Sequence, residues 1–188
     1  MSESDEQVRL ALTTFADELL DGSCAGRRER EAVSTFAFGP LLQQVDHGKF
    51  LHDPMQIGLD LPVPQVVLPD EDSMTKKNQV CKDLVIWAKP GMTCWDHHDN
   101  PTIAPAAILE WKFSENRVSE RDVKWLKAFT REYLDCVGYA ITGNQPDSAF
   151  ALSCTESGCN DDYSETMWSI RYVLEVSRCP CRSSVPFR

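Results

Sequence analysis

The chain has 188 residues, of which 42% are hydrophobic and 26% charged, so its length predicts one domain (1–188) with a proper apolar core. Its net charge of −10 argues against a protein that coats DNA tightly and nonspecifically. No apolar run approaches membrane-spanning length, and the acidic N-terminus lacks the features of a signal peptide, so we expect a cytoplasmic, membrane-free protein with reduced thiols.

The N-terminal part, about residues 1–46, is predicted to be helical. Apolar residues recur at helical spacing between Glu3 and Leu20, and again from near Arg27 to Pro40, where a kink or an end is expected. In the second helix, Glu29 falls within the apolar stripe and Glu31 nearly opposite it. Residues 46–79 contain four prolines and are predicted to be irregular, with a short extended piece at 65–68.

Two short apolar runs, at 83–87 and 106–113, predict a pair of strands joined as an antiparallel hairpin. The start of the first strand then lies beside the end of the second. Because strand side chains alternate, Asp83 is expected to share a face with Val85 and Trp87, and Glu110 is expected to share one with Lys112. A suitable register brings both carboxylates and the ammonium together, and two carboxylates are what Mg²⁺ needs from a protein.

Beyond the hairpin, Ser119 and the acids after it predict the start of a helix of about four turns. A strand is expected at 137–143, a short one at 149–153 and a final one at 167–176. Neither a glycine-rich phosphate loop nor a nucleophile elbow occurs, which argues against nucleotide hydrolases and dehydrogenases.

This arrangement resembles the PD-(D/E)xK nuclease superfamily, with Asp83 as the family's Asp and Glu110-Trp111-Lys112 as its Glu-x-Lys; Lys82 stands where the family name has Pro. The resemblance implies an α/β (α+β) restriction-endonuclease-like fold, a mixed central sheet flanked by helices with its core from about residue 80 onward. It also implies a Mg²⁺- or Mn²⁺-dependent nuclease, with DNA as the expected substrate. Asp83, Glu110 and the carbonyl of Trp111 would bind the metal, and Lys112 would activate or position the attacking water.

Members of this superfamily often add a Glu from a helix before the hairpin. We expect Glu29 to fill that role, with Glu31 second and Glu18 third. The competing interpretation is that all are solvated surface acids.

The acidity is concentrated in residues 1–72, which hold 5 basic and 14 acidic residues. Residues 73–188 hold 14 basic and 15 acidic residues. A nucleic-acid surface could therefore be built from 112–131 and the arginine-rich C-terminus. The alternative is a catalytically inactive nuclease-like fold that binds nucleic acid or, through its acidic N-terminal part, a basic protein.

Four cysteines near the C-terminus flank the expected strand at 167–176 and either form a structural zinc site or are free buried thiols. They are Cys154, Cys159, Cys179 and Cys181. The hairpin loop carries His97 and His98, at the end opposite Asp83 and Glu110. Either this loop contacts substrate or forms a homodimer contact, or its histidines are simply exposed.

Overall fold

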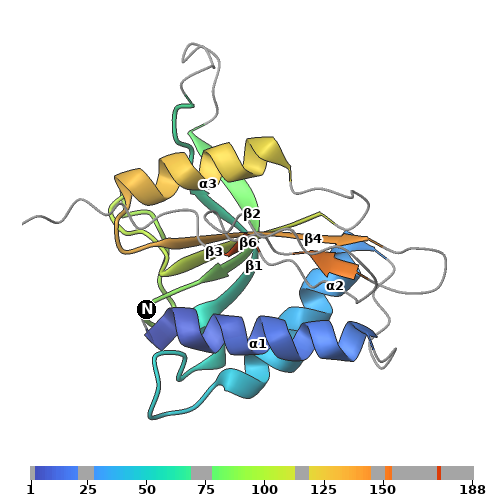
Figure 1. Cartoon of the computed structure of the whole chain (residues 1–188). Coiled ribbons are helices and arrows are strands. Elements are labelled where there is room, and N and C mark those ends of the chain that lie inside the picture. Colours follow the sequence, from blue (N-terminus) through green and yellow to red (C-terminus); the bar gives the residue numbers. More distant parts are fainter. Residues whose placement is uncertain are drawn as a thin grey trace, which may run out of the picture.

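The computed structural model describes residues 3–20, 28–68, 78–112, 119–144, 151–153 and 173–174. Helices cover both faces of a twisted mixed sheet (Figure 1). Helix α1 (Glu3–Leu20) has the bounds predicted from its apolar periodicity. Helix α2 (Glu29–Phe36) runs into a π-helical turn, η1 (Ala37–Leu41), which contains Pro40 and confirms the expected irregularity.

The sheet is built around four strands in the order β1-β2-β3-β4. They are β1 (Ile57–Pro64), β2 (Gln79–Ile86), β3 (Ala107–Lys112) and β4 (Val137–Asn144). Strand β2 pairs antiparallel with both β1 and β3, whereas β3 and β4 pair in parallel. The short strands β5 (Ala151–Ser153) and β6 (Val173–Leu174) both pair with β4. Most of the expected strand at 167–176 lies outside the described residues.

Strand β1 corrects the prediction that residues 46–79 are irregular. Pro62 and Pro64 lie inside this strand and face Cys81 and Gln79 of β2. Proline has no N–H to donate to a sheet, so it is tolerated where a strand pairs on one side only. Among the described strands β1 pairs with β2 alone, which explains how a proline-rich segment enters the sheet.

Helix α3 (Glu120–Glu132) joins the parallel strands β3 and β4. It begins as predicted, because the Ser119 hydroxyl accepts a hydrogen bond from the N–H of Asp122 at 3.3 Å. Leu126 and Phe129 are fully buried against the sheet. Trp125 of the same helix is also buried.

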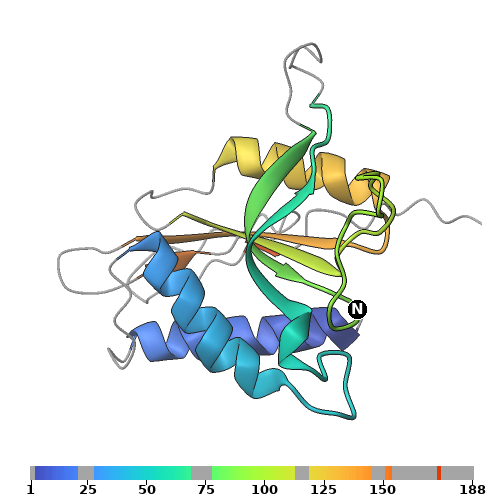
Figure 2. The ribbon, with the colours of Figure 1, turned by 180° about the vertical axis from the view of Figure 1, so that it is seen from behind.

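Two apolar cores lie on opposite faces of the sheet. Helices α1 and α2 pack on one face around a cluster that includes Phe15, Phe36 and Trp111, and α3 packs on the other. The view from behind shows β1 and β2 twisting together across the sheet, from the α3 side to the α1 and α2 side (Figure 2).

Candidate functional site

The candidate site lies where β2 and β3 separate. The two strands pair from Ile86↔Ala107 to Leu84↔Leu109, as the predicted hairpin requires. Beyond Leu84 a side chain replaces the main chain as acceptor: the N–H of Trp111 donates to Asp83 Oδ2 at 2.7 Å. Strand β2 begins at Gln79, four residues before the expected start, so Asp83 lies within the strand at the point where its pairing with β3 ends. Its carboxylate joins the two strands there.

The alternation of faces along β2 breaks at Asp83. Leu84 and Ile86 belong to the core under α1 and α2, yet Lys82, with the same parity, lies over Trp125 of α3. The ladder with β1 also omits the Asp60–Asp83 pair, and Asp60 has a left-handed φ of 51°. Strict alternation of Asp83 with Val85 and Trp87 was therefore the wrong expectation. Strands β1 and β2 change face together at this point, and Asp83 lines a cavity beside α2.

That cavity has a volume of about 100 Å³. Glu29 and Arg30 of α2 line one side of it, and Asp60 and Asp83 line another. Arg30 and Asp60 form an exposed ion pair at 3.5 Å across its rim. The cavity is large enough for a few water molecules, and its lining is rich in carboxylates.

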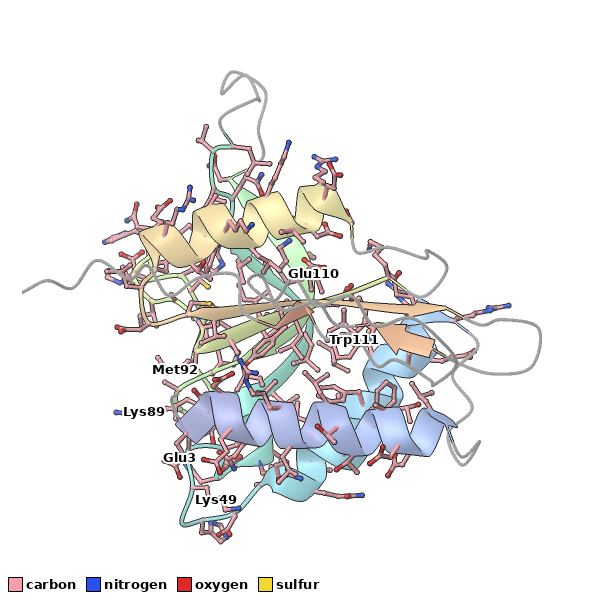
Figure 3. The ribbon with its side chains drawn as sticks, in the orientation of Figure 1. Glu3, Lys49, Lys89, Met92, Glu110 and Trp111 are labelled. Atoms are coloured by element: carbon pink, nitrogen blue, oxygen red, sulfur yellow. The ribbon has the colours of Figure 1, made fainter. Side chains whose placement is uncertain are left out.

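Glu110 lies on the α3 side of the sheet, whereas its neighbour Trp111 points to the opposite side (Figure 3). The Glu110 side chain is 8% exposed and forms an ion pair with Lys82, which is 5% exposed. The Lys82 ammonium also lies 3.6 Å from the centroid of the Trp125 ring. Burial raises the pKa of the Glu110 carboxyl, and the Lys82 ammonium acts against this rise.

Lys112 links the two sides of the site. Its Nζ donates to the carbonyl oxygen of Trp111 at 2.9 Å and lies 3.5 Å from Glu29 Oε1 and 3.9 Å from Asp122 Oδ2. Burial lowers the pKa of Lys112, but the surrounding carboxylates outweigh burial and leave it above its ordinary value. The side chain is therefore a cation at neutral pH.

The structure thus brings the predicted residues together, although not as one carboxylate pair on one face. Asp83 is bonded to the main chain, Glu110 to Lys82, and Lys112 to Glu29. Asp83 still acts electrostatically on both Glu110 and Lys112. Of the three acids considered for the additional Glu, Glu29 contacts Lys112 at 3.5 Å, whereas Glu31 is exposed on the same helix.

Asp122 is a site residue that the sequence analysis assigned only to the start of a helix. Its Oδ2 atom is buried without a hydrogen-bond partner among the described residues, and its charge raises the pKa of both Glu110 and Lys112. An acid in the first turn of a helix is explained by the helix dipole alone. Only the three-dimensional path of α3 shows that this acid faces the end of β3.

The oxygen donors fit a hard cation such as Mg²⁺ by their chemistry. Four carboxyl groups, those of Glu29, Asp83, Glu110 and Asp122, interact with the ammonium of Lys82 or Lys112 or with one another. In the described residues, however, no three Asp, Glu, His or Cys side chains lie close enough together to bind a metal directly. Lys82 and Lys112 instead form ion pairs with the carboxylates of Glu110 and Glu29.

The remaining expectations concern other parts of the chain. His97 and His98 are exposed in the hairpin loop, with ring centroids 3.8 Å apart. The four cysteines of the expected zinc site lie outside the described residues. Within those residues, no helix combines the length and apolar character needed to span a bilayer. Comparisons with protein-family models, curated proteins and solved structures found no match.

Proposed function

We propose that the chain is a Mg²⁺-dependent phosphodiesterase that cleaves nucleic acid, with DNA as the first substrate to test, on a restriction-endonuclease-like fold. One observation carries the proposal: Glu29, Asp83, Glu110 and Lys112, from three separate elements, converge on the end of β3. The order of helix, three antiparallel strands, helix and parallel strand supports it further, because the hairpin–helix–strand order is that of the nuclease superfamily.

The metal would be held by Asp83, Glu110 and the carbonyl of Trp111, with Glu29 nearby on α2. When bound, Mg²⁺ lowers the pKa of a coordinated water and offsets charge on the phosphate. Lys112 would orient the attacking water or a phosphate oxygen through its positive charge, because a lysine with a raised pKa is a poor base.

The substrate backbone would lie along α3. Four basic residues, Arg121, Lys124, Lys127 and Arg131, belong to this helix, and three of them are exposed while Lys127 is half-buried. Phosphate contacts require local positive charge, so an acidic chain can still bind DNA through one such helix.

The test is cleavage of labelled DNA with Mg²⁺ or Mn²⁺ by the wild type and by Asp83→Asn, Glu110→Gln and Lys112→Met. Each variant should lose at least about a hundredfold in rate, as removal of a single catalytic charge typically causes. Glu31→Gln is the matched control, because Glu31 is an exposed acid on the same helix as Glu29. Comparable cleavage by wild type and Lys112→Met would refute the assignment.

One observation favours a second candidate, a nuclease-like fold without activity that acts as a binding module. The Lys82–Glu110 pair already neutralises a proposed metal ligand. Calorimetric titration with Mn²⁺ separates the candidates: binding that is lost in Asp83→Asn supports the enzyme. Absence of Mn²⁺ binding, combined with DNA or protein binding that does not depend on metal, supports the binding module.

A further inference from the structure

The side chain that holds Glu110 comes from the position at which the name of the nuclease superfamily has Pro. Lys82 directly precedes Asp83, and its side chain crosses to the α3 face because β2 changes face there. Its ammonium is enclosed between the Glu110 carboxylate and the Trp125 ring. Burial of an ammonium is unfavourable unless it is paired, so this placement depends on Glu110.

A cation at this position has a direct consequence for metal binding. If Glu110 is to bind a divalent ion, its carboxylate must exchange an ammonium partner for the metal. Two cations held by one buried carboxylate repel each other strongly in a low-dielectric site. The ion can therefore enter only as the Lys82 ammonium leaves, and the free energy of the existing pair is subtracted from that of metal binding.

We propose that Lys82 is a resident counter-ion of Glu110 that competes with the divalent metal and thereby sets the affinity of the site. This inference rests on the proposed function, since it assumes that Glu110 is a metal ligand. The site alternates between a state in which Glu110 is bound to Lys82 and a state in which it is bound to metal. The structure corresponds to the first of these.

The first test compares Mn²⁺ affinities by calorimetry for wild type, Lys82→Met and Lys89→Met. Methionine keeps the length and apolar stem of lysine without the charge. Lys89 is exposed, follows the same strand and lies far from Glu110, so its variant controls for the change in net charge (Figure 3). We expect Lys82→Met to bind Mn²⁺ at least about tenfold more tightly, while Lys89→Met matches the wild type.

The outcomes distinguish this inference from the proposed function. Equal Mn²⁺ affinity in wild type and Lys82→Met overturns the competition and leaves the metal site standing. No binding by any of the three proteins overturns both proposals. Binding by Lys82→Met alone supports the competition and identifies a wild type whose site is blocked by its own lysine.

A second measurement uses the wild-type chain and remains decisive if Lys82→Met does not fold. Acetylation of lysines followed by peptide mass spectrometry reports the accessibility of each ammonium. Without metal, Lys82 should be protected, because its side chain is only 5% exposed, while Lys89 reacts. Saturating Mn²⁺ should increase modification of Lys82 several-fold and leave Lys89 unchanged. Protection of Lys82 that persists in saturating Mn²⁺ overturns the proposal.

Discussion

Asp83 has a structural role that can be separated from its proposed role as a metal ligand. Its Oδ2 accepts the N–H of Trp111 at 2.7 Å at the point where β2 and β3 stop pairing. Replacing Asp83 with Ala leaves that N–H without its acceptor. Replacing it with Asn keeps a carbonyl oxygen that can accept from this N–H, and exchanges the other, charged oxygen for an NH2 group.

The expected loss of stability follows from the single hydrogen bond between Trp111 and Asp83. A hydrogen bond to a charged group contributes about 1.5–3 kcal/mol when buried, and Asp83 is only partly buried, so the lower end applies. Loss of the negative charge also removes repulsion with Glu110 and attraction to Lys112, two effects that oppose each other. We therefore expect Asp83→Ala to be about 1–2 kcal/mol less stable than wild type, and Asp83→Asn to retain at least half of that difference.

Urea unfolding followed by tryptophan fluorescence measures this, since the chain has 5 Trp residues. With a slope of about 2 kcal/mol per molar urea, a loss of 1–2 kcal/mol lowers the midpoint by roughly 0.5–1 M. Asp17→Ala, which removes an exposed acid from α1, should stay within about 0.5 kcal/mol of wild type. If Asp83→Ala proves as stable as Asp83→Asn, the carboxylate does not join the strands and its position needs another explanation.

Two further predictions concern the scaffold. Gln56→Leu should destabilise the fold by about 3 kcal/mol or more, because the side chain of Gln56 is buried and its hydrogen bonds would be lost. It accepts from the N–H groups of His52 and Asp53 and donates to the carbonyls of Phe50, Trp87 and Ala88. The control in the same urea assay is Gln43→Leu, at an exposed site, and equal unfolding midpoints for the two variants would refute the role of Gln56. Among the described cysteines, a thiol reagent at about pH 8 should modify exposed Cys81 in the folded protein and spare Cys94, since burial raises the pKa of Cys94 to about 12 and few thiolates form. Peptide mapping by mass spectrometry measures this, and rapid labelling of Cys94 would contradict its burial.

Periodicity predicted the parts of this fold that are governed by one dominant signal. The bounds of α1 and the Ser119 cap of α3 follow from apolar spacing and capping chemistry within one segment. The β2–β3 hairpin likewise follows from two apolar runs. Strand β1 could not be found in this way, because its prolines argue against a strand until its place at one side of β2 is known.

The contacts of two polar side chains, Gln56 and Asp122, could not be predicted from the sequence either. Gln56 lies in a proline-rich stretch, and nothing local indicates that its amide will donate to the carbonyl of Trp87, just after β2 and 31 residues further along. Asp122 was visible as an acid in a first turn, and that role alone accounts for its presence. In both cases the contact spans elements whose relative placement depends on the packing of the whole sheet.

The candidate site shows most clearly why a motif does not determine its own geometry. Strand alternation assigned Asp83 to the face of Val85, and that rule holds only where φ and ψ remain extended. Asp60 in β1 adopts a φ of 51°, and the pair Asp60–Asp83 is missing from the β1–β2 ladder. Strands β1 and β2 therefore change face together at these residues. This change of face carries Lys82 to Glu110 and Asp83 to the cavity beside α2. Lys82, the residue beside Asp83, therefore pairs with the Glu110 carboxylate. In the proposed nuclease, metal binding by Glu110 would depend on the balance between that lysine and the ion.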